Sequence, residues 1–211
     1  MTELYEDESI LVILKPRGVV SETEQAGAKC VSAFFPGKKL FTVHRLDRET
    51  QGVMVYAKTA QAAAALSAQI REGGFEKKYY AVLKGAPAEK EGELSDLLVR
   101  DARRNITRIA REGEEGSKPA RLTYRILGEN QGLSLADIRL YTGRTHQIRI
   151  QFSSRSMPVY GDSLYGGGRG ELALFAYSLG FDRPVTGERM NFTLKPPPDM
   201  FPWNLFEEEL R

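Results

Sequence analysis

The chain has 211 residues, a length that suits a single domain with a sizeable core over residues 1–211. It carries 30 lysines and arginines against 28 acids, a net charge of +2, and its single cysteine excludes an intramolecular disulfide. No apolar run approaches the ~20 residues of a membrane span and the N-terminus does not resemble a signal peptide, so we expect a cytoplasmic protein without a membrane partner.

The charge is distributed unevenly along the chain. Residues 1–8 and 207–211 hold seven acids and one base, so the remainder carries 29 bases and 21 acids, a net charge of +8. No acid occurs between Asp137 and Asp162, a stretch that contains four arginines: Arg139, Arg144, Arg149 and Arg155. Such a basic stretch suits a phosphate backbone, although ordinary solvated arginines explain it equally well.

The sequence predicts both strands and helices and contains no internal repeat. Segments rich in branched and aromatic residues predict strands over 10–14, 53–57, 79–83, 122–127, 133–140 and 190–194. Thr59 can cap a helix over residues 60–71, which Gly73 and Gly74 terminate. Strands and helices do not alternate regularly, which favours an α+β fold over a doubly wound parallel sheet.

Two further segments complete this outline. Residues 145–154 are predicted to form a helix, with Thr145 as its cap. Residues 100–115 are dense in charge and poor in apolar side chains, so we expect an exposed, mobile excursion between strands that can also touch RNA.

The most informative run is HRLDRETQG at residues 44–52, which places Arg45 and Asp47 two residues apart between two apolar segments. It predicts a tight loop between two strands, with Gly52 as the turn residue. Such loops hold catalytic residues on a rigid scaffold. Taken alone, a surface turn with solvated charges explains the same residues.

Four other motifs accompany this run: KPRG at 15–18, KKYYAV at 77–82, GRTHQIR at 143–149 and YGDSLYG at 160–166. In residue type and order, all five resemble the RluA family of pseudouridine synthases, which isomerise uridine to pseudouridine within RNA. One position departs, since Gln51 stands where the family commonly has serine.

The resemblance spans nearly the whole chain. It implies the pseudouridine synthase catalytic fold, with a mixed, largely antiparallel central sheet, flanking helices and a central RNA-binding cleft. Many members of the family add a separate N-terminal RNA-binding domain, and we expect none here because residues 5–15 already resemble catalytic-domain sequence.

The same resemblance assigns catalytic roles to Asp47, Tyr79 and Arg144. The reaction breaks the bond between the sugar and a ring nitrogen, turns the base and rejoins it through a ring carbon, and an ionised carboxylate can hold the pieces covalently. Asp47 would be this nucleophile, with Arg144 as the ion-pair partner that keeps it ionised. Helical spacing would put Gln147 and Ile148 on the same face as Arg144, where they would contact the substrate.

Strand alternation sends Tyr79 and Tyr80 to opposite faces, so only one of the two rings can enter a cleft. The family pattern selects Tyr79, whose ring would stack on the uracil and whose hydroxyl would assist a proton transfer. Arg45 would fill the place that a flipped-out nucleotide vacates, although an internal salt bridge that fixes the loop is an alternative. Leu194 is assigned to the far wall of the cleft.

No metal or cofactor is expected. His44, His146 and Cys30 do not have the spacing of a zinc site, so we interpret both histidines as hydrogen-bonding scaffold. Residues 166–168 lack the pattern of a phosphate-binding loop. The prediction is a monomeric enzyme that acts on ribosomal or transfer RNA, which the motifs do not distinguish.

Two other classes remain open at this stage. The chain can be a non-catalytic RNA-binding module of the same fold, or a hydrolase that uses paired carboxylates. A binding module has no need for Asp47 together with Arg144. A glycosidase needs a second positioned acid that no motif supplies.

Overall fold

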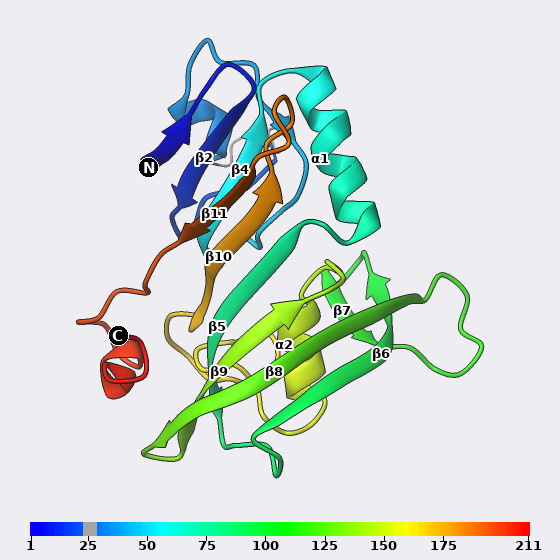
Figure 1. Ribbon diagram of the computed structural model, residues 1–211. Coiled ribbons are helices and arrows are strands. Elements are labelled where there is room, and N and C mark those ends of the chain that lie inside the picture. The colour runs from blue at the N-terminus through cyan, green and yellow to red at the C-terminus, as the bar shows by residue number, and fades with distance from the viewer. Residues whose placement is uncertain (23–28) are drawn as a thin grey trace. The chain divides into compact units, whose positions relative to one another are not determined.

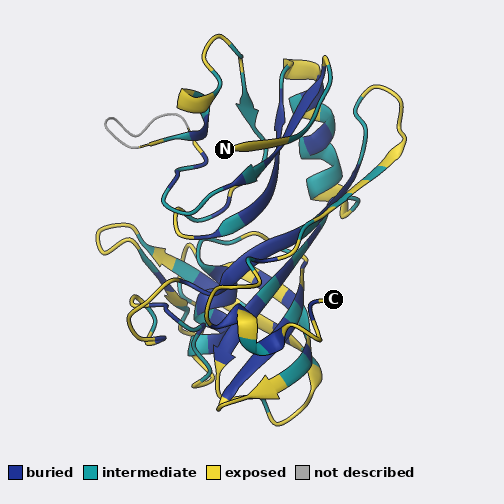
Figure 2. Cartoon of the chain, turned by 90° about the vertical axis from the view of Figure 1, so that its left-hand side faces the viewer, coloured by how far each residue is buried: buried dark blue, intermediate teal, exposed yellow. Residues whose placement is uncertain are grey.

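The structure is a computed structural model that describes residues 1–22 and 29–211. The chain divides into two compact units (Figure 1). Unit 1 contains Met1–Lys77 and Phe175–Leu194, and unit 2 contains Lys78–Leu174 and Lys195–Arg211. In both units the strands hold most of the buried residues, and many loop residues are exposed (Figure 2). Whether residues 1–211 act as a single domain stays a prediction.

Unit 1 is built on a mixed sheet. Its strands follow the order β1-β2-β4-β10-β11, with β3 paired to β4. Every pair is antiparallel except β10 and β4, which run parallel where Phe175 faces Gln51. The bounds of these strands are β1 (Thr2–Glu6), β2 (Ile10–Lys15), β3 (Phe41–Thr42), β4 (Gln51–Ala57), β10 (Leu174–Asp182) and β11 (Arg189–Thr193). A short 3-10 helix, η1 (Val31–Phe34), precedes β3.

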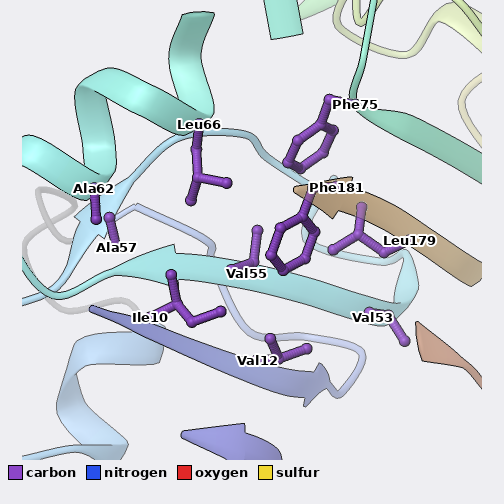
Figure 3. Close-up of a cluster of buried hydrophobic side chains, with 10 residues drawn as sticks. All are labelled: Ile10, Val12, Val53, Val55, Ala57, Ala62, Leu66, Phe75, Leu179 and Phe181. Carbon is purple, nitrogen blue, oxygen red and sulfur yellow. The ribbon is translucent and has the colours of Figure 1, made fainter. Parts of the chain in front are cut away.

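The helix α1 (Ala60–Glu72) packs on one face of this sheet (Figure 3). The hydroxyl of Thr59 accepts a hydrogen bond from the backbone N–H of Ala62 at 3.1 Å, and Gly73 ends the helix at a φ of 83°. Side chains that alternate along β2 and β4 meet α1 and β10 in a buried cluster, formed by Ile10, Val12, Val53, Val55, Ala57, Ala62, Leu66, Phe75, Leu179 and Phe181. The opposite face of β2 and β4 is buried as well, through Leu11, Ile13, Met54 and Tyr56.

Unit 2 contains an antiparallel sheet in the order β5-β9-β8-β6-β7. Its strands are β5 (Glu76–Lys84), whose first two residues belong to unit 1, β6 (Glu91–Asp101), β7 (Ile106–Ile109), β8 (Lys118–Asn130) and β9 (Leu133–Leu140). The helix α2 (Gln147–Ser153) packs Phe152 against Tyr124 of β8, with the ring centroids 5.5 Å apart. A second 3-10 helix, η2 (Trp203–Phe206), follows near the C-terminus.

Most of the predicted elements are confirmed, and the mixed, largely antiparallel sheets agree with the α+β prediction. The predicted strands all exist, although β11 ends one residue before Leu194. No helix among the described residues is long and apolar enough to cross a membrane.

Two predictions need correction. Residues 100–115 are not simply an excursion, because β7 forms an antiparallel hairpin with β6 and buries Thr107. The exposed arginines of this hairpin dominate the composition of the segment. A charge count therefore does not reveal that its backbone pairs as strands and that Thr107 is buried. The second helix begins at Gln147, and Thr145 is not its cap, since His146 occupies the cap position with a φ of 54° and no side-chain capping bond.

Candidate active site

Asp47 lies in the loop between β3 and β4, as predicted. The backbone N–H of Thr50 donates to the carbonyl of Asp47 at 3.0 Å, which closes a tight turn just before β4. Gly52 is not the turn residue, because it lies inside β4 at a φ of 143°. A Cβ at this position would come within 2.3 Å of the carbonyl oxygen of Ala176, so the close approach of β10 explains the glycine.

Buried groups hold the loop backbone on both sides of Asp47. The Ser21 hydroxyl bonds both backbone groups of Leu46, accepting from its N–H at 3.1 Å and donating to its carbonyl at 2.8 Å. The carbonyl of Arg48 accepts from the ammonium of Lys15 at 3.2 Å and from the backbone N–H of Gly18 at 2.9 Å. The Asp47 side chain itself is half-buried.

His44 acts as scaffold for this loop, which confirms its predicted role. Its Nε2 accepts a hydrogen bond from the backbone N–H of Val55 at 3.1 Å, and its ring lies edge-on to Phe75. Burial, with a smaller contribution from the charge of Lys77, lowers the pKa of His44 to about 3. The imidazole is therefore neutral near pH 7 and keeps Nε2 as an acceptor.

Arg45 has an exposed side chain in the same loop. Its guanidinium pairs with Glu22 at 3.2 Å, and both side chains are 49% exposed. This is the loop salt bridge that the sequence left as an alternative. Because such exposed pairs contribute little stability, the arginine can exchange this partner for another anion at small cost. Its contact with RNA stays a prediction.

Tyr79 lies in β5 opposite Ile138 of β9 and is buried, whereas its neighbour Tyr80 lies opposite Asp137 and is half-buried. The two rings occupy opposite faces of the strand, as alternation predicts. Stacking of Tyr79 on a uracil stays a prediction.

Arg144 lies just before α2, so helical spacing does not place it. Its backbone N–H donates to the side-chain oxygen of Gln147 at 3.1 Å, and its Nε donates to the carbonyl of Pro119 at 2.9 Å. The Gln147 oxygen also accepts from the Thr142 hydroxyl at 2.7 Å, while its nitrogen donates to the Arg121 carbonyl and to Gln151. Gln147 thus uses its whole amide to shape the Arg144 turn, and its contact with substrate stays a prediction.

The rest of α2 is buried. Ile148 and Phe152 pack into the core, as expected for an amphipathic helix. Arg149 matches neither alternative for the basic stretch, a solvated arginine or an exposed phosphate contact: it is 7% exposed and makes two hydrogen bonds with Asp162, at 2.7 and 2.8 Å. Asp162 is the acid that ends the acid-free stretch of the sequence.

Asp162 also accepts from the backbone N–H groups of Leu164 and Tyr165, so the Arg149 pair fixes the loop that follows. The Tyr165 hydroxyl lies 2.9 Å from Nδ1 of His146 and accepts from the backbone N–H of Thr107 at 2.7 Å. His146 therefore links the start of α2 to the β7 hairpin, which confirms its predicted scaffold role.

The predicted site residues are divided between the two units. Unit 1 holds Arg45, Asp47 and Leu194, and unit 2 holds Tyr79, Arg144, Gln147 and Ile148. Leu194 follows β11 and packs against the core of unit 1. The meeting of Asp47, Tyr79 and Arg144 in one cleft remains a prediction. Among the described residues, no group of three or more histidines, cysteines or acids is arranged to hold a metal ion.

Comparisons with known proteins agree with the motifs. A family model described as RNA pseudouridylate synthase matches residues 9–154. The uncharacterized RNA pseudouridine synthase YhcT of Bacillus subtilis (strain 168) is 34% identical and aligns over 93% of this chain and 69% of its own length. Ribosomal large subunit pseudouridine synthase D of Zymomonas mobilis subsp. mobilis is 31% identical over 93% of this chain and 69% of its own.

Solved structures show the same fold. Human RNA pseudouridylate synthase domain containing 4 covers 100% of this chain and 93% of its own, with a TM-score of 0.78 and 22% identity. Human RNA pseudouridylate synthase domain containing 1 covers 94% of this chain and 84% of its own, with a TM-score of 0.74 and 26% identity. With its motifs, its family match and its fold in agreement, the chain belongs to the RNA pseudouridylate synthase family and is an RNA pseudouridine synthase of the RluA type.

Proposed function

We propose that the chain converts uridine to pseudouridine within structured RNA by nucleophilic catalysis through Asp47. The observation that carries this proposal is that the family match at residues 9–154 includes Asp47, Tyr79 and Arg144, and that the backbone on both sides of Asp47 is held by buried hydrogen bonds. A fixed backbone with a half-buried carboxylate suits a nucleophile that must meet one atom of a bound nucleotide.

The proposed reaction starts from the ionised carboxylate of Asp47. It attacks the nucleotide while the bond between C1′ and N1 breaks, and it holds one fragment covalently as the uracil turns. A new bond then forms between C1′ and C5 while the covalent bond to the Asp47 carboxylate breaks, C5 releases its hydrogen as a proton, and N1 gains one. The net change is an isomerisation, so atoms and electrons balance without a cofactor.

The remaining site residues support this chemistry in the proposal. Arg144 pairs with the Asp47 carboxylate, while Tyr79 stacks on the uracil and its hydroxyl assists the transfer of the C5 proton. Ile148, Gln147 and Leu194 contact the base, and Arg45 fills the place that the flipped nucleotide leaves.

Ribosomal RNA is the substrate that we propose ahead of transfer RNA, since two relatives at 30–31% identity are named ribosomal large subunit pseudouridine synthase D. The exposed arginines of the β6–β7 hairpin, Arg100, Arg103 and Arg104, supply a basic contact for the phosphate backbone. We propose that the enzyme works as a monomer in the cytoplasm.

The direct test measures tritium release from large-subunit ribosomal RNA transcripts that carry uridine labelled at C5. Asp47→Asn should abolish release, a loss of at least about 10³-fold, with RNA affinity nearly unchanged. Glu49→Gln is the matched control, because Glu49 is an acid of the same loop that is 50% exposed. It should retain activity.

Substantial pseudouridine formation by Asp47→Asn would overturn the assignment of the nucleophile. RNA binding by the wild-type protein without tritium release would favour a non-catalytic binding module, and release of free uracil would favour a hydrolase. Mapping pseudouridine in cellular RNA with and without this gene would then identify the RNA and the position.

A further inference from the structure

We propose that Ser21 and Lys15 are positioning residues for Asp47, which hold the backbone before and after it so that its carboxylate meets the substrate in one orientation. This inference rests on the proposed role of Asp47 as the nucleophile. It adds two residues that neither touch the substrate in the proposal nor take part in the chemistry.

The loop needs such support because the sheet does not provide it. β3 ends at Thr42 and β4 begins at Gln51, so Asp47 lies in a loop between these two strands. Buried backbone polar groups need hydrogen bonds, and side chains from the end of β2 and from the segment after it supply them here. Leu46 is itself buried, which makes its N–H and carbonyl costly to leave unpaired.

Ser21 holds the residue before Asp47. Its side chain is only 2% exposed, and its single hydroxyl bonds both the N–H and the carbonyl of Leu46. The carbonyl of Leu46 belongs to the peptide bond that leads into Asp47, so this contact fixes the plane from which the Asp47 Cα extends. The Ser21 backbone is fixed in turn, because the buried Tyr56 hydroxyl donates to its carbonyl at 2.8 Å.

Lys15 holds the residue after Asp47. The side chain is completely buried, and its ammonium donates to the carbonyls of Pro16 at 2.9 Å, Val19 at 2.8 Å and Arg48 at 3.2 Å. These three bonds use all three donors of an ammonium. Burial lowers the pKa of Lys15 to about 8, while the carboxylates of Asp47 and Glu49 act in the opposite direction.

The buried ammonium of Lys15 joins the end of β2 to the Asp47 loop at a large desolvation cost. Taking a charge out of water costs several kcal/mol unless its hydrogen bonds and partner charges compensate, and an apolar residue of similar volume would avoid that cost. The arrangement is understandable if the carbonyl of Arg48 must be held at one point. An error of 1 Å in the position of a reacting group can cost about 10²-fold in rate.

The test separates positioning from plain stability with a series at Ser21. Ser21→Ala removes the hydroxyl, and Ser21→Cys keeps nearly the same volume but bonds more weakly. Ser134→Ala is the matched control, since Ser134 is also fully buried and its hydroxyl donates to a backbone carbonyl, that of Gly85, in unit 2.

The quantities to measure are the single-turnover rate at saturating RNA, the dissociation constant for the same transcript and the melting temperature. Both Ser21 variants should lower the rate roughly 10- to 100-fold with little change in the dissociation constant. Ser134→Ala should lower the melting temperature to a similar degree as Ser21→Ala but leave the rate near that of the wild type.

Lys15→Met tests the other side of the loop, and the folded variant should show the same pattern of slowed turnover with retained RNA binding. Because a fully buried lysine can be essential for folding, the Ser21 variants are the decisive test of the positioning role. A wild-type rate in Ser21→Ala would overturn the proposal. A wild-type rate in Ser21→Cys combined with a slowed Ser21→Ala would also overturn it. In either case the hydrogen bonds of the hydroxyl would be dispensable.

The Asp47→Asn variant distinguishes failure of the proposed function from failure of the positioning role of Ser21. If it retains turnover, the proposed function fails whatever Ser21 does. If it is inactive while Ser21→Ala is fully active, only the positioning role fails.

Discussion

The loop that carries Asp47 and the turn that carries Arg144 are held in different ways. Around Asp47, buried side chains from a distant segment bind the loop backbone, with Ser21 lying 25 residues before Leu46 and Lys15 lying 33 residues before Arg48. Around Arg144, the Gln147 amide combines nearby and distant partners, since it binds the Arg144 backbone three residues away, the Thr142 hydroxyl five residues away and the Arg121 carbonyl 26 residues away.

This difference has a physical consequence. The Arg144 turn combines bonds among residues 142–147 with bonds from Arg144 and Gln147 to the carbonyls of Pro119 and Arg121 in β8. Its shape therefore depends on the packing of α2 against β8, whereas the shape of the Asp47 loop depends on β2, the segment after it and β4. Single substitutions near Arg144 should therefore couple the turn to the stability of unit 2. Substitutions of Ser21 or Lys15 should change both the geometry of the Asp47 loop and the stability of unit 1.

Among the residues that would support Asp47, the largest effect is expected from Arg144→Ala. If Arg144 orients the nucleophile, the single-turnover rate at saturating RNA should fall about 10²- to 10³-fold. Arg144→Lys should rescue poorly, because an ammonium cannot reproduce a two-pronged contact with a carboxylate. An unchanged rate, with weaker and less salt-sensitive RNA binding, would move Arg144 to the RNA-contact residues.

A somewhat smaller effect is expected at Tyr79. Tyr79→Phe keeps the buried ring and removes only the hydroxyl, so the rate should fall about 10²-fold while the melting temperature changes little. Tyr80→Ala is the comparison on the opposite face of β5 and should mainly lower the melting temperature. The reverse pattern would show that the other ring serves the reaction.

Gln147→Leu tests the local support of the Arg144 turn. It leaves the buried groups around Gln147 without their partner and should cost about 2 kcal/mol in the free energy of unfolding, together with a loss of turnover. Gln69→Leu is the control, because the Gln69 amide makes two comparable bonds with the backbone of Asp182, both 2.7 Å, in unit 1. It should cost stability without lowering the rate at saturating RNA, and equal rate losses in both variants would contradict the role of Gln147.

The smallest expected effect is the loss of stability at acidic pH that His44 causes. The pKa of His44 is lowered from 6.5 to about 3, so below pH 6.5 the unfolded chain binds a proton that the folded chain does not, and stability falls as the pH drops toward 3. The loss should be on the order of 1 kcal/mol at about pH 5.5. His44→Asn, which keeps an acceptor but does not titrate, should show a weaker fall in melting temperature between about pH 7 and 5, and a fall equal to that of the wild type would exclude His44 as the cause.

Much of the fold could be predicted from local patterns. Alternation and branched residues identified β2, β4, β5, β8 and β9, and the cap at Thr59 with Gly73 bounded α1 to within a residue. The start of α2 was misplaced because a threonine before an apolar run indicates a cap by residue type alone. The structure instead uses a left-handed backbone at His146, which lies 2.9 Å from Tyr165 of a later loop.

The sequence by itself determined the family, because five motifs occur in the order that the RluA family has. It also determined which strands exist, since burial of alternate side chains is written in neighbouring residues. Only the tertiary structure decided how the site is supported. The Ser21 and Lys15 contacts end on backbone atoms, which every residue possesses, and the Arg149–Asp162 pair joins a helix to a loop 13 residues later. No local pattern distinguishes such partners, because their proximity arises only when distant segments pack together.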